Sequence, residues 1–180
     1  MFDPHAPVEV VTLRDERAGD VDAIGRVIAA AFAGEPQGGQ FERRIVDTLR
    51  ADGGLSVSLV AERDERIVGH VAFSPVSIGG EPAGSQQWYG LAPLAVLPDC
   101  RRHSIGAGLV RTGLDALRRL GARGCVVLGD PAYYTRFGFA PCGDIVFPGV
   151  PPEYCLALSF DESVPMPAGD VRYHDVFHPA

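Results

Sequence analysis

The 180-residue sequence contains no lysine and no asparagine, so all 16 of its basic side chains are arginines. This excludes any mechanism that needs a lysine amine, including that of a Walker A phosphate loop. With 23 acidic residues the formal net charge is -7. That charge argues against non-specific nucleic-acid binding, which requires a basic surface.

Cysteines are few, and long apolar runs are absent. The four cysteines lie far apart without a CxxC pair, and their spacing suggests no metal site. The longest apolar runs, such as LAPLAVLP, have about eight residues, too few to span a bilayer. The opening MFDPHAPVEV does not resemble a signal peptide. We therefore expect a cytoplasmic protein with reduced thiols and no membrane contact.

The length is typical of a single domain over residues 1–180, and the hydrophobic pattern predicts a mixed chain of helices and strands. Amphipathic periodicity indicates helices over 18–32, 40–52 and 104–120, with a short helix after Pro131. Strands are expected at 8–13, 55–63, 66–78, 88–98 and 124–130, and within 149–160 and 169–177. This order predicts a mixed sheet with helices on its faces.

Pro93 lies inside the most apolar of these strands, where proline cannot donate a ladder hydrogen bond. We expect the sheet to bulge or splay there. Backbone groups of Leu94, Ala95 and Val96 would then be unpaired and available to a ligand. An ordinary edge strand is the alternative interpretation.

The stretch RRHSIGAGLVRTG, residues 101–113, follows this strand and opens a helix, although glycine is a poor helix former. The first N–H groups of a helix have no partner within it, and the helix dipole adds positive potential there. Glycines let a phosphate approach the backbone, and Arg101 and Arg102 add charge. The segment therefore indicates an anion-binding turn. The alternative is that its glycines only permit close packing on the sheet.

Two known phosphate loops are absent, because neither GxxxxGK[ST] nor GxGxxG occurs here. The turn instead resembles Q/R-x-x-G-x-G/A, the pyrophosphate loop of the GNAT superfamily of N-acetyltransferases. It matches at Arg101 and Gly106 and departs at Ser104, where the family usually has glycine. Tyr134 in YTRFGF, four residues before a Gly-Phe pair, matches a second GNAT signature. LGDPAYYTRFGF followed by PGVPPEY is similar to a bacterial subgroup of predicted acetyltransferases whose acceptors are mostly unassigned.

The resemblance covers most of the chain and implies an α/β (α+β) fold. In that fold a mixed, mostly antiparallel central sheet is splayed at its middle and has helices on both faces. The resemblance also implies acetyl-CoA as cosubstrate and direct attack by an amine of a small molecule or peptide. The cofactor-binding residues that it implies are Leu94, Ala95, Val96, Arg101, Arg102, His103, Ser104, Ile105, Gly106, Ala107, Asp130 and Phe137.

The same resemblance implies catalytic roles. The Val96 N–H would polarise the thioester carbonyl, and Tyr134 would protonate the departing thiolate as general acid. A core aromatic is the alternative for Tyr134. No general base is obvious: the candidates are His70, Asp130, Glu153 and a chain of waters. A lone histidine on one strand face is more often structural, and for Asp130 a helix-capping role is expected first.

The sequence is compatible with three functions. An N-acetyltransferase is the leading one. A non-catalytic acyl-CoA-binding or regulatory GNAT-like protein is the alternative, and a nucleotide-binding domain is disfavoured by the absent fingerprints. The segments 34–40 and 79–87 and the C-terminal strands would select the acceptor, and the acidic balance suits a cationic amine. The sequence allows a homodimer. A positive φ at Ser104 would strain a non-glycine residue and would put cofactor binding in doubt.

Overall fold

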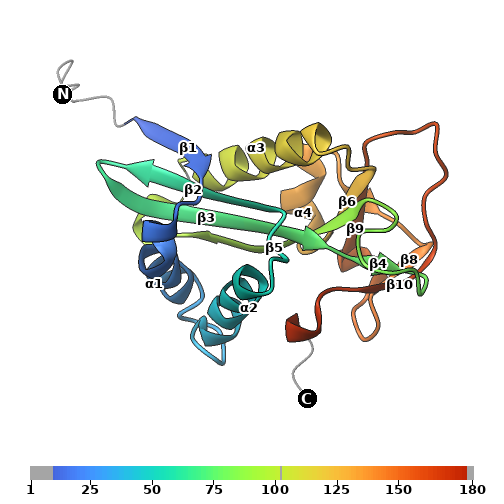
Figure 1. The fold of residues 1–180 in the computed structure, drawn as a ribbon, viewed down its shortest axis with the longest axis horizontal. Coiled ribbons are helices and arrows are strands. Elements are labelled where there is room, and N and C mark those ends of the chain that lie inside the picture. Colours follow the sequence, from blue (N-terminus) through green and yellow to red (C-terminus); the bar gives the residue numbers. More distant parts are fainter. Residues whose placement is uncertain (1–9, 102, 178–180) are drawn as a thin grey trace.

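A seven-stranded sheet forms the centre of the structure, a computed structural model that describes residues 10–101 and 103–177 (Figure 1). Its strand order is β1-β2-β3-β5-β6-β9-β7, and all neighbours are antiparallel except β5 and β6. The strands are β1 (Val11–Asp15), β2 (Val57–Arg63), β3 (Arg66–Pro75), β5 (Trp88–Val96), β6 (Gly124–Leu128), β9 (Cys155–Ser159) and β7 (Ala140–Pro141). The predicted mixed, mostly antiparallel sheet is therefore confirmed.

A second sheet of three short strands lies beside the first, in the order β4-β10-β8. These strands are β4 (Ser77–Ile78), β10 (Gly169–Arg172) and β8 (Ile145–Val146). A separate apolar cluster packs around them and contains Ile78, Trp88, Phe147 and Tyr173. Residues from β4 and β5 and from the C-terminal third of the chain thus form a second small core at one end of the main sheet.

The helices cover both faces of the main sheet, as predicted (Figure 1). On one face lie α1 (Val21–Ala31) and α2 (Gln40–Ala51), and on the other lies α3 (Ile105–Arg119). The short α4 (Pro131–Tyr134) follows β6. The apolar periodicity of α3 buries Leu109, Val110, Leu114 and Leu117 against the sheet. No helix within the two described ranges has the length and apolarity that crossing a membrane requires.

Several predicted boundaries need correction. The strand expected at 66–78 divides into β3 and β4, which belong to different sheets. The strand expected at 8–13 is β1, displaced to Val11–Asp15, with its first two predicted residues outside the described range. The strand expected within 169–177 ends at Arg172, and a 3-10 turn over Asp175–Phe177 follows it. The two-residue strands β7 and β8 were not expected.

The main sheet opens along β5, as the position of Pro93 predicts. Strand β5 pairs with β6 only over Trp88–Gly90, although it pairs with β3 from Tyr89 to Val96. The β3–β5 register shifts beside Ala92 and Pro93, which are joined by a cis peptide bond. Because β5 has neighbours on both sides, the alternative of an ordinary edge strand is wrong.

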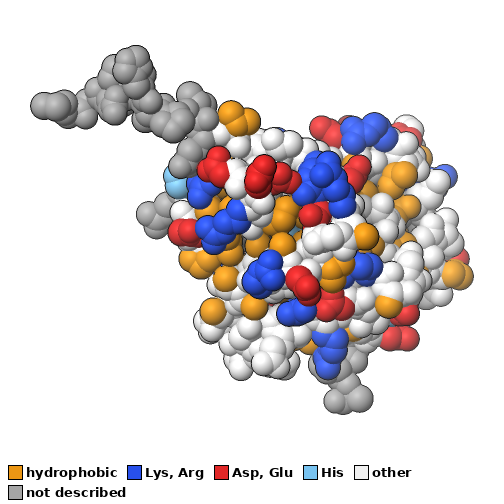
Figure 2. Space-filling view, turned by 60° about the vertical axis from the view of Figure 1, so that its left-hand side comes forward, with side chains coloured by type: hydrophobic (Ala, Val, Ile, Leu, Met, Phe, Trp, Pro, Cys, Tyr) orange, Lys and Arg blue, Asp and Glu red, His pale blue; other side chains and the backbone are white. Residues whose placement is uncertain are grey.

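Charge is distributed without a large basic patch on the face that Figure 2 shows, where arginine and acidic side chains are interspersed. Apolar side chains appear between them in small groups. Charges of opposite sign thus lie close together over this face.

Two glycines of α3 differ in how closely neighbouring side chains pack against them. A Cβ at Gly113 would lie 2.2 Å from Cε2 of Phe73, so this glycine lets the helix pack directly on the aromatic ring from β3. A Cβ at Gly108 would meet only Cδ1 of Leu13, at 3.0 Å, the end of a flexible side chain. Close packing on the sheet therefore explains Gly113.

These contacts predict opposite responses to alanine on the same helix. Gly113→Ala should destabilise the protein by about 1–3 kcal/mol, because the added methyl overpacks a fully buried ring. The matched Gly108→Ala variant should be neutral or stabilising by up to about 1 kcal/mol, because alanine is the better helix former. Urea denaturation of both variants measures the difference, and equal effects would contradict this account of the packing.

Candidate functional site

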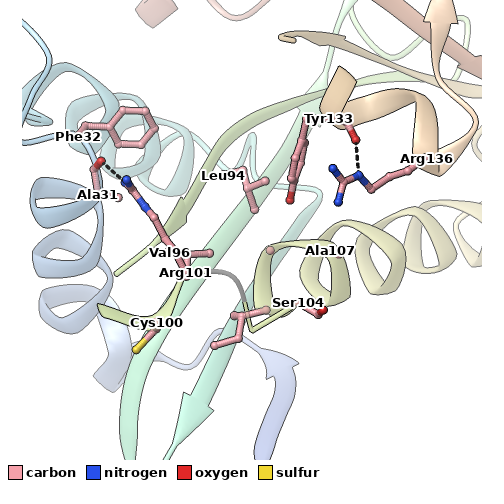
Figure 3. Close-up of a pocket in the computed structure, with 12 residues that line it drawn as sticks. Ala31, Phe32, Leu94, Val96, Cys100, Arg101, Ser104, Ala107, Tyr133 and Arg136 are labelled. Atoms are coloured by element: carbon pink, nitrogen blue, oxygen red, sulfur yellow. Dashed lines mark hydrogen bonds between the residues drawn. The ribbon is translucent and has the colours of Figure 1, made fainter. Parts of the chain in front are cut away.

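A cavity of about 450 Å³ lies where the open part of β5 meets the beginning of α3 (Figure 3). Its lining residues come from the end of α1, from β5, from the turn before α3 and from α4 and the turn after it. They are Ala31, Phe32, Leu94, Val96, Cys100, Arg101, Ser104, Ile105, Gly106, Ala107, Tyr133 and Arg136. The fold thus brings together most of the residues for which the sequence predicts cofactor binding.

The turn before α3 presents free backbone donors to this cavity. The first backbone hydrogen bond of the helix runs from the Gly108 N–H to the Ser104 carbonyl, at 2.9 Å. The N–H groups of Ile105, Gly106 and Ala107 precede that bond and belong to the unpaired first turn of the helix. A Cβ at Gly106 would lie 2.8 Å from the Tyr133 hydroxyl, so glycine keeps the backbone accessible at the cavity wall.

Ser104 precedes the helix with φ 60° and ψ 10°, the left-handed conformation, and its side chain makes no capping hydrogen bond. For a residue with a Cβ this conformation costs about 1–2 kcal/mol. The strain that a positive φ implies is therefore present. The same conformation explains why glycine is the usual residue at the corresponding position of the GNAT loop.

Two guanidinium groups flank the cavity from different elements (Figure 3). Arg101 Nη2 donates to the Ala31 carbonyl at 2.7 Å, which fixes the turn against the end of α1. Arg136 Nε donates to the Tyr133 carbonyl at 2.8 Å, and its guanidinium lies 4.6 Å from the centroid of the Tyr133 ring. With the helix N-terminus between them, these cations make the cavity favourable for an anion.

Other predicted cofactor residues lie outside this lining. Ala95 is buried on the opposite side of β5, paired with His70 of β3. His103 is exposed, with Nδ1 3.4 Å from the Cys100 carbonyl oxygen. Arg102 lies outside the described residues.

Two more predicted cofactor residues lie around α4. Asp130 caps this helix, because its Oδ1 accepts a hydrogen bond from the Ala132 N–H at 2.9 Å, which confirms the capping role expected first. Phe137 packs edge-on against Tyr133, with 5.6 Å between ring centroids, and under the Arg111 guanidinium. Both residues support the aromatic side of the cavity without lining it.

Tyr134 follows Tyr133 at the end of α4. Its ring packs edge-on against Tyr133, with centroids 5.0 Å apart, and against Phe139 at 5.9 Å. Burial, and then the neighbouring Tyr133 and Cys125, raise the pKa of Tyr134. The hydroxyl therefore remains protonated at neutral pH, which is the state that a proton donor requires.

His70 is the buried member of a polar cluster under α2. Its side chain is 0% exposed, and its Nε2 lies 2.9 Å from Ser58 Oγ and 3.7 Å from Glu16 Oε2. Ser58 donates to Glu16, which also accepts from Arg50 Nε of α2 at 2.5 Å. Burial lowers the pKa of His70. Burial alone would raise the pKa of Glu16, but hydrogen bonds from His70, Arg50 and Ser58 outweigh it and hold that pKa well below its usual range.

This cluster favours the structural interpretation of His70. His70 lines neither the cavity at α3 nor the opened edge of β5. A neutral imidazole lies beside Ser58, whose hydroxyl donates to a Glu16 carboxylate paired with Arg50, and this chain ties β3, β2 and α2 together. Glu153, another predicted base, is exposed in the turn before β9.

A second cavity, of about 700 Å³, lies on the other side of the bulge in β5. Leu91 and Ala92 line this second cavity, whereas the cavity at α3 begins at Leu94, two residues further along the same strand. The remaining walls come from α2, the end of β6, the loop after β8 and the C-terminal segment. They are Phe41, Leu128, Phe147, Pro148, Val150, Val171, Arg172, Tyr173, Asp175 and Phe177.

The sequence interpretation missed two residues that line the cavity at α3 and one that follows Phe41 of the second cavity. Tyr133 and Arg136 line the cavity at α3, whereas the sequence signature pointed to Tyr134, the neighbour of Tyr133. Glu42 lies on the buried face of α2 with Ile45, and its Oε2 is buried without a hydrogen-bond partner among the described residues. A carboxylate on an apolar helix face was the available signal, because 42, 45, 46 and 49 share that face.

The splayed sheet and the anion-binding turn together define the acyltransferase class of α/β domains. The model of the Acetyltransferase (GNAT) family matches residues 26–139, so the chain belongs to this family. It is 41% identical over 171 residues to the uncharacterized N-acetyltransferase YhbS of Escherichia coli K12, covering 92% of this chain and 98% of that protein.

Two solved structures share the fold at high similarity. A GNAT family acetyltransferase from Brucella melitensis, in complex with acetyl-CoA, superposes with a TM-score of 0.80 and 46% identity, covering 94% of this chain and 99% of the other. The Escherichia coli YhbS structure, in complex with CoA, superposes with a TM-score of 0.86 and 34% identity, covering 98% and 97%. These matches confirm the predicted fold class.

The backbone at Ser104 gives a direct prediction. Ser104→Gly should stabilise the free protein by about 1 kcal/mol, because glycine adopts the left-handed conformation without a Cβ clash and loses part of that gain to its more flexible unfolded state. Ser104→Ala is the matched control, since alanine keeps the Cβ and should gain nothing. Thermal melting measures both variants, and a Ser104→Gly midpoint equal to that of the wild type would refute the assigned strain.

Proposed function

We propose that this chain transfers an acetyl group from acetyl-CoA to the primary amine of a small molecule or peptide by direct attack. The observation that carries this proposal is the cavity at α3, which joins an open strand edge to a helix N-terminus flanked by two guanidinium groups. The relative named as an N-acetyltransferase and the two relatives solved with acetyl-CoA or CoA support it.

The residues of the cavity fit the chemistry of coenzyme A. Peptide-like amides of the pantetheine arm need strand-like partners, and β5 from Leu94 to Val96 has no strand on its β6 side. The pyrophosphate needs donors and positive charge, which the N–H groups of Ile105 to Ala107, Arg101 and Arg136 supply.

Ser104 is compatible with this binding. Its left-handed backbone is already formed in the structure, so the following N–H groups are in place before any ligand arrives. The strain of about 1–2 kcal/mol therefore opposes folding and leaves the binding step unaffected. The positive φ expected to disfavour cofactor binding is present at Ser104, and we propose that its cost falls on folding.

The proposed reaction exchanges one bond for another at the acetyl carbon. The lone pair of the amine nitrogen forms the new N–C bond, and the C–S bond breaks with its electrons going to sulfur. The Val96 N–H polarises the carbonyl oxygen. Tyr134 gives its hydroxyl proton to the thiolate, and the amine loses a proton to a base.

Tyr134 lies beside the cavity at α3, because it packs on Tyr133, which lines that cavity. This position supports its proposed role as the proton donor to the departing sulfur.

For the base we propose Glu42. His70 is buried in its cluster, and Asp130 is engaged in capping α4. Glu42 instead has a buried carboxylate oxygen that no described residue hydrogen-bonds, and it follows Phe41 of the second cavity. An ionised carboxylate can itself accept the proton that the acceptor amine loses.

Steady-state kinetics test the function as a whole. CoA release should require both acetyl-CoA and an amine, and isothermal titration should show acetyl-CoA binding below high micromolar concentrations. Absence of binding would refute the proposal. Binding without transfer to any amine would instead favour a non-catalytic acyl-CoA-binding protein, the alternative raised by Ser104.

Tyr134→Phe should lower kcat by about 100-fold or more, because a positioned proton donor contributes about that factor. The acetyl-CoA dissociation constant should stay unchanged, since Tyr134 does not line the cavity at α3. Tyr133→Phe is the matched control: its hydroxyl lies beside Gly106, so its effect should fall on acetyl-CoA affinity. Full turnover by Tyr134→Phe would remove the acid role and leave the proposed function standing.

Glu42→Gln should lower kcat by about 100-fold or more, and the limb of the pH–rate profile on which the base titrates should disappear. Glu153→Gln is the control, since Glu153 is exposed and its loss should leave the profile unchanged. A Glu42→Gln enzyme that keeps both limbs of the wild-type profile would show that another group accepts the proton.

A further inference from the structure

The second cavity lies where a substituent of the acceptor would have to go. Its β5 residues, Leu91 and Ala92, directly precede Pro93, and the cavity at α3 begins at Leu94. An amine that attacks a thioester held along Leu94–Val96 would extend its substituent across the bulge into this space. The following inference rests on the proposed transfer to an amine.

Aromatic rings form the wall opposite β5. The rings of Phe147 and Tyr173 lie 5.7 Å apart, and those of Tyr173 and Phe177 lie 4.6 Å apart. The Tyr173 hydroxyl points inward and donates to the Val126 carbonyl at 3.4 Å, which holds the ring in the wall. Gly90 permits this position, because a Cβ there would lie 2.1 Å from the Tyr173 ring.

The C-terminal segment that carries these rings is held in place against α2. The 3-10 turn over Asp175–Phe177 packs on α2, and His174 Nε2 lies 3.5 Å from Asp52 Oδ2 at the end of that helix. Figure 1 shows this segment, in red, returning beside α2. The aromatic wall and Phe41 of α2 therefore belong to one preformed enclosure.

The charged side chains that line the second cavity have a net charge of about zero. Asp175 and Arg172 are its charged residues, both exposed at the rim, and neither forms an ion pair with a described residue. A polyamine would need several carboxylates to replace the water around its ammonium groups. The acidic residues that give the chain its net charge of -7 are thus not concentrated in the lining of the second cavity.

We infer that the acceptor is a primary amine whose carbon skeleton ends in an aromatic ring or a group of similar apolar bulk, bound in this second cavity. A space of about 700 Å³ walled by four aromatic side chains admits such a group. Ring-on-ring packing then adds to the gain from removing apolar surface from water. A peptide or polyamine chain would leave this wall without a partner.

An amine series tests the inference with the intact protein. CoA release is measured with 2-phenylethylamine, n-propylamine, 1,4-diaminobutane and a glycine-rich peptide with a free N-terminus. The kcat/KM for 2-phenylethylamine should exceed that for n-propylamine by about tenfold or more. Preference for the diamine or the peptide would overturn the inference while the proposed function stands. No transfer to any of the four, with acetyl-CoA still bound, would overturn both.

Two exposed leucines supply a matched pair of variants. Leu128, 40% exposed, lines the second cavity, and Leu120, 55% exposed, lies at the far end of α3. Leu128→Asp should reduce the kcat/KM ratio of 2-phenylethylamine to n-propylamine by about tenfold, whereas Leu120→Asp should leave that ratio unchanged. Circular dichroism and thermal melting confirm that both variants fold. An unchanged ratio in Leu128→Asp would overturn the inference.

Discussion

The end of the β5–β6 pairing after Gly90 is the constraint on which the site depends. Up to that residue the two parallel strands share hydrogen bonds, and beyond it they separate while β5 continues along β3. Backbone groups that lose a strand partner inside a protein must find another. One side of the opening meets the N-terminus of α3, and the other meets the aromatic C-terminal segment. A single interruption of a ladder thus creates both cavities and separates them by one bulge.

The position of α2 depends on a different interaction, the polar cluster beneath it. Arg50 reaches from α2 to Glu16, which is bonded in turn to Ser58 of β2 and lies near His70 of β3. This partly buried charge pair is specific in geometry even where its net contribution to stability is small. Since α2 also carries Phe41 and Glu42, the cluster fixes how the second cavity is walled. His70 thereby serves the site from a distance.

Much of this arrangement was predictable from local sequence. Pro93 in an apolar strand indicated the opening, and the glycine-bearing turn indicated the anion site. Asp130 before Pro131 indicated the cap. These features are predictable because each follows from what one residue does to its own backbone. The resemblance to GNAT supplied the mostly antiparallel, splayed sheet with helices on both faces, which no local pattern encodes.

The rest depends on contacts that are distant in sequence. Tyr133 and Tyr134 are adjacent on one helical turn, and only packing on Gly106 decides which ring lines the cavity. The pattern of 169–177 predicts a strand. The strand instead ends at Arg172, and the Tyr173 ring packs between those of Phe147 and Phe177. The unpartnered oxygen of Glu42 becomes visible only when every neighbouring donor has been placed.

The arginine surface has a consequence for an enzyme that handles an activated acetyl group. Every blue side chain in Figure 2 is a guanidinium, because the chain has no lysine. Guanidinium groups stay protonated at any physiological pH and are poor nucleophiles, whereas a lysine amine deprotonates far more readily and then attacks thioesters. The protein therefore presents no side-chain amine that its own cosubstrate could modify. Other proteins exposed to acetyl-CoA can be acetylated on lysine side chains. This chain cannot undergo that side reaction, because it contains no lysine.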